Sequence, residues 1–174
     1  MAQSAERYCL FDTEFGLTGI AWNEAGLTRV QLPEADVAAT RARLEKHGAV
    51  EGEPPPEIAA VRDRLRAYFD GAETDFSDIA VVLPEGASDE RRRIYAATRA
   101  LGWGETASYG EVAKRGGIPH GAQAVGQAMA ANPLPIIIPC HRVLAAGDRL
   151  GGFSAYGGVL TKERLLVLEK ARLL

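Results

Sequence analysis

Apolar and turn residues alternate over residues 7–32 and then give way to helical spacing, and this change of pattern limits the fold most strongly. Three short apolar stretches bounded by Gly and Asn predict strands of a small antiparallel sheet: residues 8–11, 17–22 and 27–32. Helical spacing follows over 34–47 and 57–70, and each segment ends at a glycine, Gly48 and Gly71. The pattern therefore predicts an α+β fold that opens with a small N-terminal antiparallel sheet and its helices.

A break in periodicity over residues 72–87, with Pro84 and Gly86 near its end, predicts a domain boundary. We expect an N-terminal α/β domain over 1–86 and a mostly helical C-terminal domain over 87–174. The second domain should contain further helices, for which Ser88 and Ser108 are suitable N-caps. These helices are expected over residues 88–101, 108–114, 121–131 and 161–174.

Two of the predicted helices, 108–114 and 121–131, are separated by the turn 116–119 and form a helix-turn-helix outline. In the second helix, Ala122, Val125 and Met129 share one face and are expected to pack inward. Its other residues have almost no side-chain bulk, which allows a backbone to approach another surface closely. That surface is either another part of the protein or a groove of nucleic acid, and composition does not choose between them.

The composition, 47% hydrophobic and 25% charged over 174 residues, is that of an ordinary globular chain. No apolar run reaches the roughly 20 residues of a membrane span, and the N-terminus lacks a secretory pattern, so we expect a cytoplasmic protein without membrane contact. Two cysteines and three histidines form no spaced cluster, so no metal is expected. The net charge of −3 argues against general coating of nucleic acid, although a local basic face remains open.

The apolar run Ile136–Ile138 before Pro139 predicts a buried strand that delivers Cys140 to the rim of a pocket. A free cysteine, with a pKa of about 8.5, is only slightly ionised at neutral pH, so a base such as His141 would activate it. Neighbours on a strand point to opposite faces, so a water or a sharp turn is needed between them. The alternative is an inert buried cysteine beside a structural histidine.

Glu169 strengthens the first interpretation, because it lies on an apolar face of the last predicted helix. That face also contains Leu165, Leu166 and Leu173. A carboxylate there needs a partner, and His141 would complete a cysteine–histidine–carboxylate arrangement with Cys140. The alternative is a surface ion pair with Arg164 or Arg172.

Residues 88–174 closely resemble the O6-alkylguanine-DNA alkyltransferases, also called methylated-DNA–protein-cysteine methyltransferases. The most specific segment is Ile138-Pro139-Cys140-His141-Arg142-Val143 after the turn Asn132-Pro133. Further matches are Ser108-Tyr109-Gly110, Ala124-Val125-Gly126, Gly152-Phe153-Ser154 and the terminal helix from Lys162 to Glu169. The N-terminal half looks like the variable first domain of that family but carries no motif.

The resemblance implies DNA repair by direct, single-turnover transfer of an alkyl group from O6 of guanine to Cys140, without a cofactor. His141, oriented by Glu169, would take the thiol proton through a water. Tyr109 would bind the flipped base and supply a proton as guanine leaves, and Asn132 would brace the turn beside the cysteine. The base itself would be held by the carbonyls at Cys140 and Val143 and by the hydroxyl of Ser154.

The implied partner is double-stranded DNA containing O6-alkylguanine, bound by a monomer associated with the nucleoid. The small helix would enter the minor groove, and its target base would flip out of the stack. We expect the following residues to contact DNA: Ala122, Gln123, Ala124, Gly126 and Arg142.

Three departures from the family pattern stand out. Gln123 replaces an arginine that usually fills the space of the flipped base, and Ala130 replaces a basic residue near phosphate. Two extra residues occur around Ala155-Tyr156 in the expected pocket wall. The main alternative is an alkylguanine lesion-binding sensor without efficient transfer. A thiol hydrolase and a transcription regulator are weaker alternatives, because neither an oxyanion arrangement nor base-reading side chains are evident.

Overall fold

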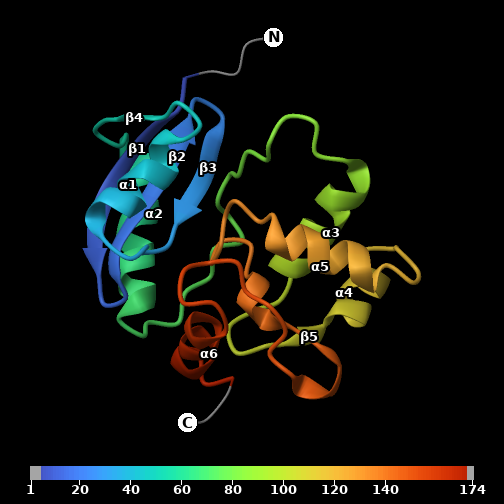
Figure 1. The fold of residues 1–174 in the computed structure, drawn as a ribbon. Coiled ribbons are helices and arrows are strands. Elements are labelled where there is room, and N and C mark those ends of the chain that lie inside the picture. The colour runs from blue at the N-terminus through green and yellow to red at the C-terminus, as the bar shows by residue number, and fades with distance from the viewer. Residues whose placement is uncertain (1–4, 172–174) are drawn as a thin grey trace. The chain divides into compact units, whose positions relative to one another are not determined.

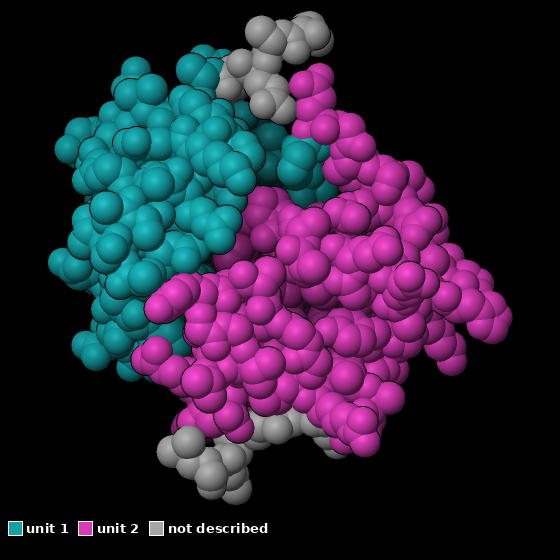
Figure 2. Space-filling model, in the orientation of Figure 1, with its two compact units in different colours: residues 1–84 teal, residues 85–174 magenta. Residues whose placement is uncertain are grey.

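The computed structural model describes residues 5–171, and the chain forms two compact units, residues 1–84 and 85–174 (Figure 2). The first unit contains a small sheet with two helices, and the second is mostly helical (Figure 1). The α+β fold predicted from the sequence is thus confirmed. Among the described residues, no helix has both the length and the apolar character that a membrane crossing requires.

The sheet of the first unit has the strand order β3-β2-β1-β4. Three strands form an antiparallel meander, as the apolar stretches predicted: β1 (Arg7–Thr13), β2 (Gly16–Asn23) and β3 (Gly26–Gln31). The two-residue strand β4 (Val50–Glu51), which pairs in parallel with β1, was not predicted. A strand this short has too few residues to show a period of two.

Two helices pack on this sheet, α1 (Val37–Glu45) and α2 (Pro56–Phe69). Helix α1 begins at Asp36, whose carboxylate accepts a hydrogen bond from the backbone N–H of Ala39 at 2.7 Å. Cys9 on β1 is buried in this unit, and burial raises the pKa of its thiol to about 11. A thiol with a raised pKa stays protonated at neutral pH, and Cys9 packs in the core of this unit.

The second unit contains four α-helices among its described residues: α3 (Asp89–Arg99), α4 (Tyr109–Arg115), α5 (Ala122–Ala130) and α6 (Val159–Leu168). Both predicted N-caps are confirmed, because Ser88 accepts from the N–H of Arg91 and Ser108 from that of Glu111. Two 3-10 turns, η1 (Cys140–Arg142) and η2 (Ala146–Asp148), lie between α5 and α6.

A two-stranded parallel sheet joins β5 (Ala107–Ser108) to β6 (Val143–Leu144). This pairing brings the start of α4, which carries Tyr109, next to the segment that follows Cys140. Local sequence gave no sign of it, because each strand has only two residues. The pairing therefore unites site residues that lie about 30 positions apart in the chain.

The predicted strand before Cys140 is wrong. Ile136–Ile138 is buried, but Ile136 has a left-handed backbone (φ 74°). Hydrogen bonds are local, from Ile138 N to Leu134 O at 2.7 Å and from Cys140 N to Ile138 O at 2.7 Å. A short apolar run indicates burial but does not separate a strand from a buried turn, and here the local bonds form turns.

Two helix predictions also need correction. Ala122 does not pack inward but is exposed at the start of α5, and Ala128 takes the inward position with Val125 and Met129. The terminal helix ends at Leu168, so Glu169 is its C-cap residue and Lys170 adopts a left-handed conformation. The part of the prediction that concerns residues 172–174, including Leu173, lies outside the described residues.

Helix α5 is tied to α3 by one buried hydrogen bond. The hydroxyl of Tyr95 donates to the carbonyl of Ala128 at 2.8 Å. Ala128 lies in the last turn of α5, where carbonyl groups lose their partners within the helix. The Tyr95 hydroxyl therefore gives the buried carbonyl of Ala128 a hydrogen-bond donor that helix α5 itself does not supply.

Replacing Tyr95 with Phe should lower the free energy of unfolding by about 1–2 kcal/mol, because the Ala128 carbonyl loses its donor. Urea unfolding measures this change. Tyr156→Phe is the control, because Tyr156 is exposed and its loss should change stability by less than about 0.5 kcal/mol. Equal stability of both variants would contradict the assigned bond.

Candidate active site

Cys140 is the first residue of the 3-10 turn η1 and is buried. Asn132 holds the backbone before this turn through both polar atoms of its side-chain amide. Its Nδ2 donates to the carbonyl of Ile138 at 2.8 Å, and its Oδ1 accepts from the N–H of Leu134 at 2.9 Å. These two hydrogen bonds agree with the bracing role that the resemblance implied for Asn132. The braced backbone is a turn and not the predicted strand.

His141, the next residue of η1, is fully buried and lies against Glu169. The distance from His141 Nε2 to Glu169 Oε2 is 2.6 Å. This bond occupies Nε2 of the imidazole. The predicted pairing of His141 with Glu169 is thus present, because α6 ends where η1 packs against it.

Arg142 holds the same carboxylate. Its Nε donates to Glu169 Oε1 at 2.8 Å and its Nη2 to Oε2 at 3.0 Å, a bidentate arrangement. Its Nη1 donates to the carbonyl of Leu101 at 2.6 Å. Arg142 is only 5% exposed, so its predicted role as a DNA contact does not fit: the guanidinium is a buried partner of Glu169. Glu169 is only 1% exposed, so the alternative of a surface ion pair does not fit, and Arg172 lies outside the described residues.

The ionisation of these groups follows from burial and pairing. Burial alone would raise the pKa of Glu169, but hydrogen bonds and charge from His141 and Arg142 hold it well below its usual range. Burial lowers the pKa of His141, against the pull of Glu169. Glu169 is therefore a carboxylate supported by His141 and Arg142, and His141 is neutral.

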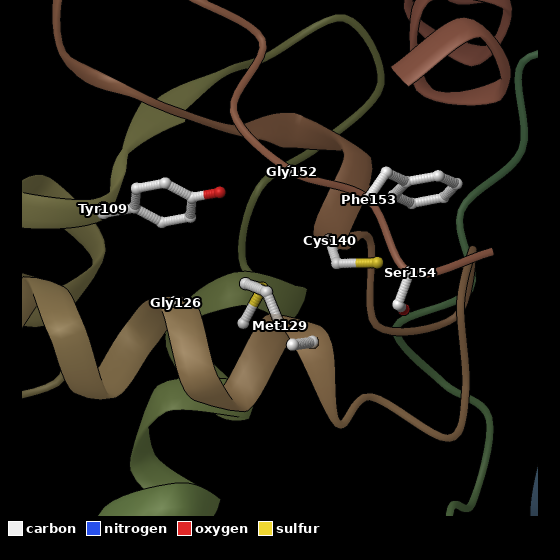
Figure 3. A pocket seen from close by; sticks show the side chains of 8 residues that line it. Tyr109, Gly126, Met129, Cys140, Gly152, Phe153 and Ser154 are labelled. Atoms are coloured by element: carbon white, nitrogen blue, oxygen red, sulfur yellow. The ribbon is translucent and has the colours of Figure 1, made fainter. Parts of the chain in front are cut away.

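A pocket of about 250 Å³ opens beside the thiol. Figure 3 shows Tyr109 on one side, Phe153 and Ser154 on the other, and Met129 of α5 next to Cys140. Burial raises the pKa of Tyr109, so its hydroxyl stays protonated and available as a donor. The complete lining is Tyr109, Gly126, Met129, Ala130, Cys140, Gly152, Phe153 and Ser154.

The predicted site residues thus fall into three groups. Cys140, Tyr109, Ser154 and Gly126 line the pocket, whereas Asn132, His141 and Glu169 are not part of its lining and form the hydrogen bonds described above. On helix α5, Ala122 and Gln123 are exposed and Ala124 is half-buried; none of the three lines the pocket. The carbonyl of Val143, expected to bind the base, accepts from Lys162 Nζ at 2.7 Å.

Several residues were missed. Met129, Phe153 and Gly152 line the pocket although the sequence suggested no chemistry for them. Lys162 belongs to the terminal-helix motif but received no role, and it is buried in the site. Its position in the repeat of α6 gave one signal, because it precedes Leu165, Leu166 and Glu169 on the inward face. Metal-binding clusters of three or more suitable side chains do not occur within residues 5–171.

The fold and the site together define a class: an α+β protein with a buried cysteine, an acid-oriented histidine and a pocket bounded by a short, small-residue helix. Comparison with known families agrees. The model of the "6-O-methylguanine DNA methyltransferase, DNA binding domain" matches residues 89–171.

Named relatives match nearly the whole chain. The methylated-DNA–protein-cysteine methyltransferase of Mycolicibacterium paratuberculosis is 34% identical over 163 residues, which cover 94% of this chain and 92% of the relative. That of Mus musculus is 34% identical over 179 residues, covering 97% and 84%. A crystal structure of Mycobacterium tuberculosis OGT in complex with DNA has a TM-score of 0.77 at 33% identity, covering 95% and 93%. The chain belongs to the methylated-DNA–protein-cysteine methyltransferase family.

Replacing Glu169 with Gln should lower the free energy of unfolding by about 3 kcal/mol or more at neutral pH, because the buried guanidinium loses its countercharge. The depressed pKa of Glu169 means that its contribution is complete above the ordinary carboxyl pKa of about 4.3 and is lost as pH falls below it. The stability gap between wild type and variant should therefore narrow in acid.

Denaturant unfolding across a range of pH measures that gap. Glu163→Gln on the same helix is the control, and it should change stability by no more than about 0.5 kcal/mol. A gap that stays constant from neutral pH into acid would rule out an ionised Glu169 as its origin.

Proposed function

We propose that this protein repairs DNA by moving the alkyl group of O6-alkylguanine to Cys140 in a single-turnover reaction. The observation that carries the proposal is that the buried Cys140 lines a pocket and that its neighbour His141 is hydrogen-bonded to Glu169. Family membership supports the same activity. The protein acts as a methylated-DNA–protein-cysteine S-methyltransferase, and each molecule is consumed because a thioether is not cleaved by water.

The reaction begins with loss of the thiol proton. The proton passes from Cys140 Sγ through a water to His141 Nδ1, while Glu169 stabilises the imidazolium that forms. Sγ attacks the alkyl carbon in line, so that a C–S bond forms as the C–O bond to guanine breaks. The departing guanine takes a proton from the Tyr109 hydroxyl, and Ser154 donates a hydrogen bond to O6.

The DNA partner fits the distribution of charge along the chain. Residues 85–174 contain twelve Lys and Arg against eight Asp and Glu, a formal charge of +4, whereas residues 1–84 carry −7. The second unit is therefore basic although the net charge of the whole chain is −3. Attraction to DNA phosphates requires positive charge on the DNA-binding unit, and the net charge of the whole chain does not measure that local charge.

Helices α4 and α5, joined by the turn at 116–121, act as the DNA-binding helix-turn-helix. Helix α5 exposes Ala122, Gln123 and Gln127, and its small side chains allow the backbone to approach the minor groove. Gly126 has open space where a Cβ would stand, so no internal contact requires a glycine there. The protein binds as a monomer, in the cytoplasm at the nucleoid, and flips the damaged base into the pocket.

Mass spectrometry after mixing with an oligonucleotide that contains O6-methylguanine tests the transfer. We expect one added methyl group on Cys140 and none in Cys140→Ser, with the Cys9 peptide unmodified as an internal control. Retained lesion binding without any adduct at equimolar DNA would instead identify a lesion-binding sensor.

Replacing Gln123 with Arg should tighten binding to lesion-containing DNA by about 1 kcal/mol, roughly fivefold, because an arginine adds a charge and fills the space of the flipped base better. Titration with labelled duplexes measures the change. Gln127→Arg is the matched control, since it adds the same charge to the same helix. If both variants gain equally, Gln123 does not occupy the position of the flipped base.

A further inference from the structure

Arg93 on α3 binds the turn that joins α4 to α5. Its Nη1 donates to two backbone carbonyls of that turn, Gly116 O at 3.1 Å and Gly117 O at 3.3 Å. Its Nε donates to Asp89 Oδ2 at 3.1 Å, one turn earlier on the same helix. One guanidinium thus connects α3 to the turn of the proposed helix-turn-helix.

The two carbonyls lie just beyond the end of α4. Gly116 is the C-cap residue of that helix, and Gly117 follows it with a left-handed backbone (φ 72°). Carbonyl groups at the end of a helix lack partners within it and carry the negative end of the helix dipole. Arg93 therefore caps α4 from a different helix, because it supplies both donors and positive charge. A Cβ at Gly117 would lie only 3.3 Å from the same Nη1.

Helix α5, which follows this turn, supplies few bonds to hold its own position. Five of its nine residues are alanine or glycine, and its N-cap residue, Gly121, has no side chain to bind the first N–H groups. A helix of nine residues is marginal by itself, so its placement depends on bonds from outside.

Helix α3 supplies such bonds at both ends of α5. Arg93 holds the turn before it, and the hydroxyl of Tyr95 donates to Ala128 O in its last turn at 2.8 Å. Helix α3 also packs against both α4 and α5 (Figure 1). The orientation of α5 is therefore set from α3.

We propose that Arg93 is a positioning residue for DNA binding. By capping α4 it fixes the direction in which α5 leaves the turn, and so presents the small residues of α5 to the minor groove. The inference rests on the proposed function of α4 and α5 as the DNA-binding helix-turn-helix. It assigns a task in DNA binding to α3, which lies outside that motif, and Arg93 is not part of the pocket lining.

A direct contact with a DNA phosphate is a different role that the same cation could have. Arg91, Arg92 and Arg93 follow one another on α3, as in a basic surface patch. Three hydrogen bonds to protein acceptors, however, use three of the five N–H groups of Arg93. The bonds of Arg93 therefore favour positioning, and the experiment separates the two roles.

The test is titration of a labelled undamaged duplex at several salt concentrations. Arg93→Met removes the charge and the hydrogen bonds, whereas Arg93→Lys keeps the charge but lacks the planar fork that binds two carbonyls and Asp89 together. Arg92→Met is the matched control, because it removes an exposed arginine from the next position of the same helix. Methyl transfer at increasing DNA concentration gives the half-saturating concentration and the limiting rate separately.

We expect both Arg93 variants to bind the duplex about tenfold more weakly, because the turn loses charge-assisted hydrogen bonds. The slope of log affinity against log salt should stay that of wild type, since no phosphate contact is lost. The half-saturating DNA concentration for methyl transfer should rise by the same factor at an unchanged limiting rate. Arg92→Met should stay within about twofold of wild type in affinity.

Two results would overturn the proposal. One is wild-type affinity in a folded Arg93 variant. The other is wild-type affinity in Arg93→Lys combined with a salt slope smaller by about 0.9 in Arg93→Met, which identifies a phosphate contact. Alkylation of the buried Cys140 by iodoacetamide checks the fold of residues 85–174. Faster alkylation marks a variant that has lost its fold, and the other Arg93 variant then decides.

Failure of this inference differs from failure of the proposed function. Methyl transfer to Cys140 by the wild-type protein decides the repair activity and involves no change at Arg93. Transfer by wild type together with undiminished duplex binding in Arg93→Lys and Arg93→Met would keep the activity and remove the role of Arg93. A wild-type protein that binds no duplex would contradict the helix-turn-helix itself, and this inference with it.

Discussion

The buried carboxylate of Glu169 is the interaction on which the site depends. It binds His141 Nε2 through one oxygen and Arg142 through both, and Gly104 N approaches the other oxygen at 3.4 Å. One charged group at the end of α6 thus fixes the imidazole, the guanidinium and a nearby backbone segment. A buried charge of this kind requires all its partners, so the turn η1 and the end of α6 must form together.

This dependence also explains why the acceptor turn needs no regular strand. The backbone before Cys140 is held by local bonds, by Asn132 and by the packing of three isoleucines. The two-residue pairing of β5 with β6 then places Tyr109 across the pocket from the thiol-bearing turn. Side-chain hydrogen bonds and a two-stranded sheet thus hold the site residues in place. The strands themselves are too short to be stable alone.

Much of the architecture was predictable because its signals are local. Ser88 and Ser108 cap helices where their hydroxyls precede helical spacing, and the three strands of the first sheet end at Gly and Asn turns. The pairing of His141 with Glu169 was predictable from a carboxylate on an apolar face. The burial of Arg142 was not, since its sequence neighbours carry no sign of it, and the burial of Lys162 had one signal, its place among the inward-facing residues of α6.

By itself the sequence determined the α+β class and predicted Cys140, His141 and Glu169 as the site, because residue chemistry and periodicity are properties of neighbouring positions. Only the tertiary structure decided that Cys140 lies on a 3-10 turn, that Arg142 faces inward and that Lys162 joins the pocket wall to the thiol segment. Those outcomes depend on contacts between α6, η1 and the 151–154 loop. The burial of these side chains and the distances between their charged groups are set only when these segments come into contact.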